Sequence, residues 1–240
     1  AKLGKVLKLS STRKSGQKPR YDLYFVSAEI EMLGRNHLDT LEAAISGGAT
    51  IVQLRDKSRA DGALREIALS ALELARKAGV PLVINDRIEV AAAVRADGVH
   101  LGQDDSSPIL ARELLGENAI IGVSASTVDE AQRAEAEGAD YLGVGPVFPT
   151  TSKPDAVAHI GLDGLARIRE VVSIPIVAIG GITREKVADL IRAGADGIAV
   201  IAAIAEADDM VAAARGLRDE VAKALRLRKG ARPGDENFDR

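Results

Sequence analysis

The sequence contains no cysteine and no tryptophan. The lack of cysteine excludes disulfides, thiolate metal sites and cysteine nucleophiles, and it fits a reducing compartment. No apolar run approaches the ~18 residues that a membrane helix needs. The first residues also lack the hydrophobic core of a secretory signal peptide. We therefore expect a cytoplasmic protein that does not enter a membrane.

Acidic side chains are missing from residues 1–20, in which every charged residue is lysine or arginine. The whole chain has a net charge of −3, so the remainder is acidic. A basic arm of this kind can bind nucleic acid or a membrane surface, but no aromatic residue interleaves its charges. We therefore expect a flexible arm and no nucleic-acid partner. Residues 228–240 are polar, contain glycine and proline, and predict a flexible tail. We predict that residues 21–227 form a single catalytic domain.

Short apolar runs alternate with amphipathic stretches throughout this domain. The runs are continuously apolar, which is typical of parallel strands buried on both faces. We predict eight strands, at 21–27, 50–54, 81–84, 98–101, 120–124, 141–145, 174–179 and 197–201. The amphipathic stretches predict helices at 37–46, 64–78, 88–95, 107–115, 128–137, 162–171, 183–193 and 208–227.

A weak internal repeat supports one closed architecture. Each copy is expected to have a glycine that ends a helix, a tight polar turn and then a buried strand; the copies lie at 47–52, 96–101, 138–144 and 194–200. Eight such units in 240 residues favour a (β/α)8 TIM barrel, an α/β fold with a closed parallel sheet and outer helices. The alternative is a doubly wound open sheet, but Gly180-Gly181 is not a dinucleotide-binding fingerprint.

Polar residues of functional types follow the predicted strands at one end only, and barrel enzymes carry their active sites at that end. Gln53, Arg55 and Lys57 alternate after the second strand, so their side chains project to one side and form an anion clamp. An alternative of equal weight is that Arg55 pairs with Asp86 or Asp105 in a polar layer of the barrel.

Asp86 and Asp105 follow neighbouring strands and together suit one hard cation. Magnesium prefers a few carboxylates with water and phosphate oxygens as further ligands. Asp105 could also cap the helix that begins near Pro108, and the two roles are compatible. Zinc is not expected, because the chain has no cysteine and neither His37 nor His159 is well placed for it.

Two loops are suited to phosphate. The stretch GVGPVFPTTSKPDA at 143–156 contains three prolines, which exclude a helix and a central strand, and it offers hydroxyls together with Lys153. Its simpler interpretation is a surface turn with a solvated lysine. Gly180-Gly181 and the turn after the eighth strand can form a backbone phosphate cup. The simpler interpretation of that pair is a tight turn.

Taken in order, these motifs resemble those of the thiamine-phosphate synthase family. The resemblance runs from about residue 21 to the last helix and rests on VQLRDK (52–57), INDR (84–87), VHLGQDD (99–105), GVSAST (122–127), GVGPVFPTTSKPDA (143–156), IVAIGGI (176–182) and GIAVIAAI (197–204). It implies a TIM-barrel transferase that condenses hydroxymethylpyrimidine diphosphate with hydroxyethylthiazole phosphate to give thiamine phosphate and pyrophosphate. It also implies one Mg²⁺ that bridges the diphosphate.

The resemblance assigns roles residue by residue. Catalysis falls to Arg55, Lys57, Ser124 and Lys153, and the metal to Asp86 and Asp105. Substrate binding falls to Gln53, Arg55, Lys57, Asn85, Ser124, Thr150, Ser152, Lys153, Gly181, Ile201 and Ala202. Ala202 departs from the family pattern, which commonly has serine there, so the phosphate cup would lose a hydroxyl and keep its backbone donors.

The resemblance to the thiamine-phosphate synthase family implies a dissociative reaction. Pyrophosphate leaves, a pyrimidine methylene cation forms, and the thiazole nitrogen captures it. Such a step needs stabilisation of the leaving group rather than a strong base. Two other functions stay open, namely a thiazole tautomerase-like isomerase and a catalytically inactive barrel that binds thiamine phosphate. The expected partners are small phosphorylated substrates, and a homo-oligomer is possible.

Overall fold

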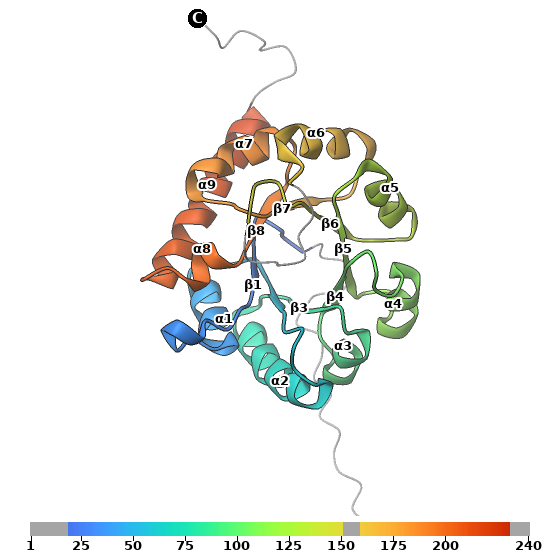
Figure 1. The fold of residues 1–240 in the computed structure, drawn as a ribbon, viewed down its shortest axis with the longest axis vertical. Coiled ribbons are helices and arrows are strands. Elements are labelled where there is room, and N and C mark those ends of the chain that lie inside the picture. Colours follow the sequence, from blue (N-terminus) through green and yellow to red (C-terminus); the bar gives the residue numbers. More distant parts are fainter. Residues whose placement is uncertain (1–18, 151–158, 231–240) are drawn as a thin grey trace, which may run out of the picture.

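The computed structural model describes residues 19–150 and 159–230, and these residues form a closed barrel of parallel strands (Figure 1). The strands follow one another around the barrel in chain order, and β8 pairs with β1 to close it, with Leu23 beside Ile198. They are β1 (Leu23–Val26), β2 (Ile51–Leu54), β3 (Leu82–Asn85), β4 (Gly98–Leu101), β5 (Ile120–Ala125), β6 (Tyr141–Val144), β7 (Ile176–Ile179) and β8 (Gly197–Val200). The predicted fold class is confirmed.

The strands are buried on both faces, as continuous apolar runs predict. Every residue of β2 and β3 is buried. The outward-facing side chains belong to a large aliphatic cluster shared with the helices. A smaller cluster fills the barrel interior and includes all three tyrosines of the chain, Tyr21, Tyr24 and Tyr141. The tyrosines are therefore concentrated in the barrel interior, where they fill volume.

Helices surround the barrel (Figure 1). The α-helices are α1 (His37–Ser46), α2 (Asp61–Ala78), α3 (Ile88–Val94), α4 (Pro108–Leu115), α5 (Val128–Ala136), α6 (Gly161–Val171), α7 (Val187–Arg192), α8 (Ala202–Ala205) and α9 (Met210–Gly230), and the 3-10 helices are η1 (Glu31–Leu33) and η2 (Arg184–Lys186). The last helix packs against both α7 and α1 and so completes the outer ring.

Predicted and observed elements differ mainly at their ends. Helix α2 begins three residues before the predicted start at residue 64, and the predicted helix 183–193 divides into η2 and α7. Helix α9 ends at Gly230 rather than at residue 227. Most of the expected arm and tail lies outside the described residues, so their flexibility stays a prediction. None of the helices in the described ranges is both long and apolar enough to cross a bilayer.

Candidate active site

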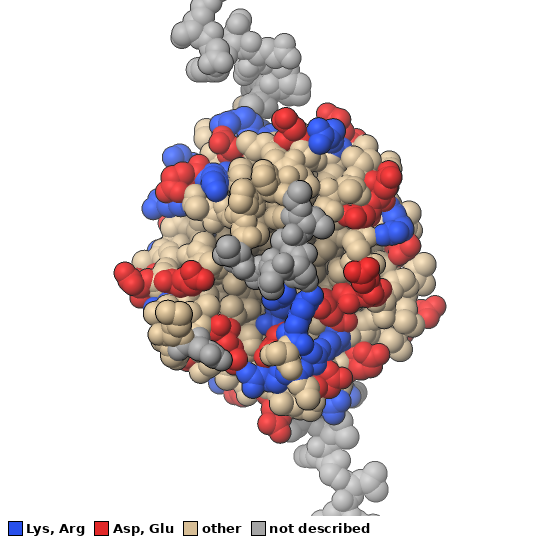
Figure 2. All heavy atoms as spheres, in the orientation of Figure 1, with Lys and Arg blue, Asp and Glu red and all other residues tan. Residues whose placement is uncertain are grey.

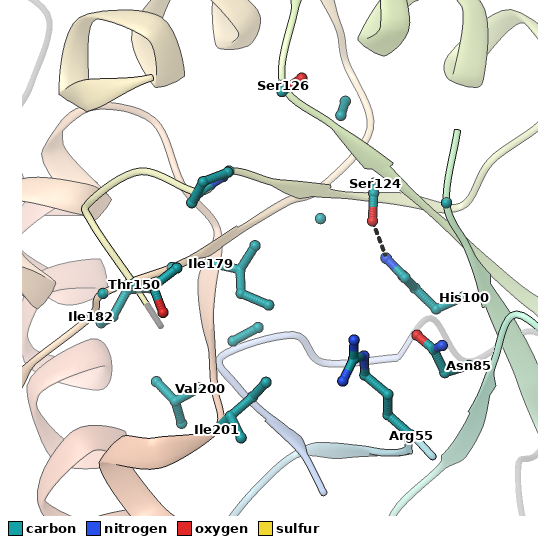
Figure 3. A pocket seen from close by; sticks show the side chains of 18 of the residues that line it. Arg55, Asn85, His100, Ser124, Ser126, Thr150, Ile179, Ile182, Val200 and Ile201 are labelled. Atoms are coloured by element: carbon teal, nitrogen blue, oxygen red, sulfur yellow. Dashed lines mark hydrogen bonds between the residues drawn. The ribbon is translucent and has the colours of Figure 1, made fainter. Parts of the chain in front are cut away.

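A cavity of about 980 Å³ opens at the carboxyl ends of the strands. Residues that follow β2, β3, β4, β5, β7 and β8 all line it, which is the end where the sequence predicts the site. Figure 3 shows Arg55, Asn85 and Ser124 on one side of the cavity and Thr150 and Ile201 on the other. The barrel thus brings two groups of predicted site residues to face each other.

Two carboxylates lie together on the first side. The Asp105 carboxyl group lies close enough to Asp86 to raise its pKa, and Oδ2 of Asp105 accepts from Gly102 N at 2.6 Å. Burial raises the pKa of Asp86 to about 6, the Asp105 carboxyl group adds to the rise, and Lys57 and Arg55 oppose it. A divalent cation between the two carboxylates would offset the repulsion between their negative charges. The donor set therefore fits one magnesium ion.

The alternative role of Asp105 as a helix cap is wrong. Ser107 is the N-cap of α4, because its hydroxyl accepts from Leu110 N and Pro108 occupies the first helical turn. Pro108 has no N–H and is suited to that position. Asp105 instead stabilises the preceding loop by accepting from Gly102 N, and its carboxyl group lies near Asp86.

The basic side chains of the second loop lie beside this pair. Nζ of Lys57 is 3.9 Å from Oδ2 of Asp86. Among the described residues no ion pair joins Arg55 to Asp86 or Asp105, and Arg55 affects Asp86 through its charge. Figure 2 shows lysine and arginine side chains gathered next to acidic ones below the centre of this face. Arg55 therefore stays available for an anion in the cavity.

The opposite side of the cavity is built from backbone. Gly181 has φ +61°, and a Cβ there would lie 2.3 Å from the carbonyl oxygen of Pro149. Only glycine allows this approach. Within residues 19–150 and 159–230, the N–H groups of Gly181 and Ala202 donate no backbone hydrogen bond. Partly buried N–H groups of this kind are suited to the oxygens of a phosphate.

Comparison with known proteins identifies the family to which the chain belongs. A family model described as thiamine monophosphate synthase matches residues 23–204. The chain belongs to this family. A thiamine-phosphate synthase of Chloroflexus aurantiacus is 58% identical over 196 residues, covering 82% of this chain and 90% of the relative. One from Moorella thermoacetica is 50% identical over 206 residues, covering 86% and 98%.

A solved structure extends this likeness to three dimensions. The thiamine phosphate pyrophosphorylase of Pyrococcus furiosus superposes with a TM-score of 0.78 at 40% identity, covering 85% of this chain and 97% of that one. The predicted thiamine-phosphate synthase family is therefore confirmed, and so is the prediction of an enzyme of the transferase class.

Most of the site residues that the family resemblance predicts lie in the one cavity. Those in the described ranges that line it are Arg55, Lys57, Asn85, Asp86, Asp105, Ser124, Thr150, Gly181, Ile201 and Ala202. Ser152 and Lys153 lie outside the described residues. Gln53 is the exception: it is 3% exposed, does not line the large cavity, and donates from Nε2 to the Tyr24 hydroxyl at 2.8 Å. The roles of all these residues stay predictions.

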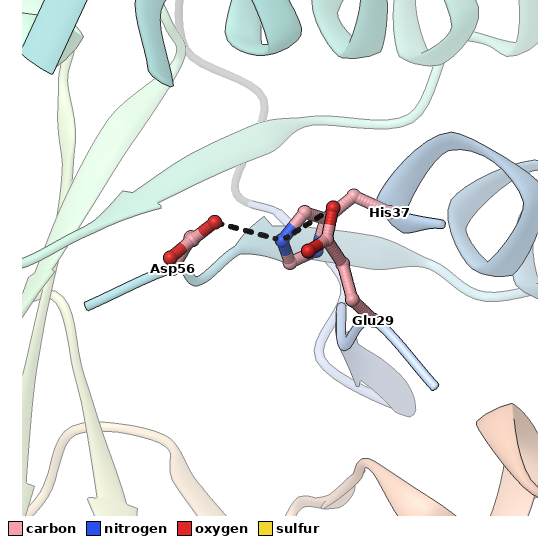
Figure 4. Close-up of side chains that lie close together, drawn as sticks. All are labelled: Glu29, His37 and Asp56. Atoms are coloured by element: carbon pink, nitrogen blue, oxygen red, sulfur yellow. Dashed lines mark hydrogen bonds and ion pairs between the residues drawn. The ribbon is translucent and has the colours of Figure 1, made fainter. Parts of the chain in front are cut away.

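Glu29, His37 and Asp56 form a second cluster with metal-ligand chemistry (Figure 4). His37 Nε2 is 3.4 Å from Asp56 Oδ2 and 3.9 Å from Glu29 Oε1. Arg59 bridges the same two carboxylates, at 2.7 Å from each. Burial raises the pKa of Asp56, but hydrogen bonds from Arg59 and Ser58 outweigh it and hold the pKa well below its usual range. Because the Arg59 guanidinium already pairs with both carboxylates, we interpret the cluster as an ion-pair network.

This network and Arg87 shape the loop that carries the family's basic residues. Asp56 accepts from Ser58 N and Arg59 N, both at 3.0 Å, which folds the loop into a turn. Arg87 donates to the carbonyl oxygen of Lys57 at 3.2 Å and to that of Arg59 at 2.6 Å. The family motif INDR thus contributes a clamp on the neighbouring loop, which the sequence analysis did not predict.

Two further cavity residues were missed from the sequence. Lys186 lines the cavity near Gly181, donates to its carbonyl oxygen at 2.7 Å, and lies 4.3 Å from the ring centroid of Phe148. His100 hydrogen-bonds to Ser124 Oγ at 2.9 Å (Figure 3). His100 is separated from the GQDD turn only by Leu101, which was a signal in the sequence. No feature of the sequence indicated that Lys186, in the short helix η2, belongs to a site.

Proposed function

We propose that the protein is a thiamine-phosphate synthase, which joins hydroxymethylpyrimidine diphosphate to hydroxyethylthiazole phosphate and releases pyrophosphate. The observation that carries the proposal is a single cavity with two anion-binding sides. One side has Arg55, Lys57 and a carboxylate pair, and the other has a backbone cup. A reaction between a diphosphate and a monophosphate needs both sides, whereas an isomerase that acts on one phosphate needs only the cup.

In this proposal, different residues bind the diphosphate and the metal ion. Arg55 and Lys57 bind the diphosphate, and Asp86 and Asp105 would hold one magnesium ion beside it. When bound, that ion supplies positive charge that stabilises the leaving pyrophosphate. The bond between the pyrimidine methylene carbon and the diphosphate oxygen breaks, and the electron pair leaves with pyrophosphate. The thiazole nitrogen then donates its electron pair to the methylene carbon. We propose that Lys153 and Thr150 also contact the diphosphate, from the loop after β6.

The cup holds the thiazole phosphate in this proposal. Gly181, Ile201 and Ala202 direct backbone N–H groups to its oxygens, and Ser124 contacts the pyrimidine on the other side. Both ends of the reacting pair are then fixed, which places the thiazole nitrogen next to the methylene carbon. No strong base is needed, because the nitrogen that attacks carries a free electron pair.

The test is an assay of the full chain with both substrates in magnesium buffer. Equal amounts of thiamine phosphate and pyrophosphate are the expected products. Conversion of a single thiazole phosphate isomer without pyrophosphate release would instead indicate a tautomerase-like isomerase. Tight binding of thiamine phosphate with no turnover would indicate an inactive binding barrel.

Lys186 should strengthen the cup, and its removal should affect one substrate only. In Lys186→Met we expect the KM for the thiazole phosphate to rise about tenfold, because a phosphate loses a nearby positive charge. The KM for the pyrimidine diphosphate should stay unchanged. Steady-state kinetics with each substrate varied in turn measures both. Phe148→Leu is the matched control, since it removes the ring beside Lys186 and keeps the charge. A rise in both KM values in Lys186→Met would contradict the assignment.

Magnesium binding should weaken in acid. Asp86 must lose its proton to bind a cation, and its pKa is raised to about 6. Below that pH the apparent affinity should fall by up to about tenfold per pH unit, and above it the affinity should level off. Calorimetric titration of magnesium with pyrophosphate present, at about pH 5 and about pH 7.5, measures the change. An affinity that is equal at both values would contradict a role for Asp86.

A further inference from the structure

A continuous line of side-chain hydrogen bonds crosses the barrel interior beneath the cavity. We call it the polar chain, and its members in order are Gln53, Tyr24, Tyr141, His100 and Ser124. Gln53 Nε2 lies 2.8 Å from the Tyr24 hydroxyl, which lies 2.8 Å from the Tyr141 hydroxyl. His100 continues the line, with Nδ1 2.9 Å from that hydroxyl and Nε2 2.9 Å from Ser124 Oγ. Five different strands contribute one residue each.

The first member sets the direction of the chain. An amide nitrogen donates and does not accept, so the Tyr24 oxygen is the acceptor of the Gln53 bond. Burial raises the pKa of Tyr24 and of Tyr141 well above the usual range, so each tyrosine keeps one O–H. Among the described residues, Gln53 and Tyr141 are the two side-chain hydrogen-bond partners of the Tyr24 hydroxyl, so a satisfied Tyr24 proton is directed to the Tyr141 oxygen. The Tyr141 proton is in turn directed to His100 Nδ1.

The direction of these bonds selects one tautomer of His100. Because Nδ1 accepts, a neutral imidazole carries its proton on Nε2, and Nε2 donates to Ser124 Oγ. The hydroxyl proton of Ser124 then points away from His100, and Ser124 lines the cavity. The Ser124 hydroxyl is thereby set as a donor toward the cavity.

Glycines on β5 and β6 hold the rings in place. A Cβ at Gly143 would lie 2.9 Å from His100 Cε1, and a Cβ at Gly122 would lie 2.1 Å from Tyr141 Cζ. Both rings therefore pack directly against backbone, and they have little room to turn. The packing of the interior thus fixes the orientation of the Tyr141 and His100 rings within the polar chain.

We propose that His100 is a positioning residue, held by the polar chain in its Nε2–H tautomer, that orients the Ser124 hydroxyl as a donor to a hydrogen-bond acceptor of the substrate. The acceptor is of the class of an aromatic ring nitrogen, such as those of a pyrimidine. The identity of that substrate rests on the proposed function. The tautomer does not, because it follows from contacts within the protein.

The tautomer can be measured without any substrate. We would label the full chain with ¹⁵N-histidine and record the ring-nitrogen NMR spectrum, in which His37, His100 and His159 are the only histidines. His100→Gln assigns the His100 signals by their loss. We expect a protonated Nε2 and an unprotonated, hydrogen-bonded Nδ1. Tyr141→Phe removes the donor to Nδ1 and should change the Nδ1 signal. A protonated Nδ1, or a spectrum that Tyr141→Phe leaves unchanged, would overturn the proposal.

Kinetics of two variants test the positioning role. The amide of His100→Gln reaches the place of Nε2 and can still donate to Ser124, whereas the shorter side chain of His100→Asn reaches only the place of Nδ1. We expect His100→Asn to lower kcat/KM for the pyrimidine diphosphate about tenfold, the effect of one lost hydrogen bond, and His100→Gln to recover most of it. The KM for the thiazole phosphate should not move in either variant.

Equal losses in the two variants, with both folded by circular dichroism, would contradict the positioning role. If either variant fails to fold, the NMR measurement on the unaltered protein still decides the tautomer. A wild-type protein that makes no thiamine phosphate would refute the proposed function and leave the tautomer to be judged by its own spectrum.

Discussion

Asp86→Asn is expected to lower turnover on the order of 10² to 10³-fold while the protein remains folded. The carboxylate would lose its charge, and with it the ability to hold a cation between Asp86 and Asp105. The loss should appear in kcat for thiamine phosphate formation at saturating concentrations of both substrates. Added magnesium should recover only part of it.

The same substitution should not destabilise the protein. The pKa of Asp86 is raised from 3.8 to about 6, so between these values the folded state binds more protons than the unfolded state. Its contribution to stability is therefore present in acid and is lost as the pH rises through about 6. Asparagine cannot ionise, so we expect the free energy of unfolding at neutral pH to rise by on the order of 1–2 kcal/mol.

Urea denaturation at about pH 5 and about pH 7.5 measures this difference, which should be larger at the higher pH. Asp189→Asn is the matched control, because Asp189 pairs with Arg192 on the exposed side of α7 and does not line the cavity. It should leave turnover unchanged. An Asp86→Asn protein that is both unstable and inactive would indicate a structural role instead of a metal-binding one.

Arg55→Ala is expected to reduce turnover on the order of 10²-fold, because a fork of donors would be lost from the leaving diphosphate. Arg55→Lys should recover part of the rate, since it restores the charge without the bidentate geometry. The measurement is kcat/KM for the pyrimidine diphosphate, with thermal unfolding as the check on folding.

Arg192→Ala provides the control for the loss of an exposed arginine. Its side chain is 76% exposed and bonds to Asp189, so its removal should change stability by less than about 1 kcal/mol and turnover not at all. A near-wild-type rate in Arg55→Ala would mean that the diphosphate does not lie on this side of the cavity.

The barrel could be predicted from the sequence because its signals are local. Continuous apolar runs mark strands that are buried on both faces, and a glycine caps the end of α1, α2 and α4. The expected glycine at the helix end is wrong for α3, which is capped by Arg95. The loops that follow the strands then all lie at the carboxyl end of the barrel, because the strands are parallel. The helix ends were harder to predict. Helix α2, for example, has Ala60 at its N-cap and no side-chain capping bond, so no capping residue in the sequence marks its start.

Gln53 illustrates where the local signal ends. The period of two correctly predicts that it projects to the same side as Arg55. It does not give depth: Gln53 lies two residues, about 7 Å, further into the barrel, and there its amide meets Tyr24. A shared face of a barrel strand therefore includes both residues that line the cavity and residues that support them from below.

The polar chain could not be predicted for a different reason. Its members are separated by up to 117 residues, the distance along the sequence between Tyr24 and Tyr141. Their contact depends on the register of strands that are paired only in the closed barrel. Lys186 is similar, since its place at the cup depends on the loop that carries Phe148. Such contacts between distant residues need the three-dimensional structure.

The most direct test of the proposed site is a crystal structure of the full chain with magnesium, pyrophosphate and thiamine phosphate. We expect pyrophosphate and the metal between Arg55 and the Asp86–Asp105 pair, and the phosphate of thiamine phosphate at the N–H groups of Gly181 and Ala202. Both phosphorylated groups bound on the same side of the cavity, or a metal at Glu29, His37 and Asp56 instead, would contradict it.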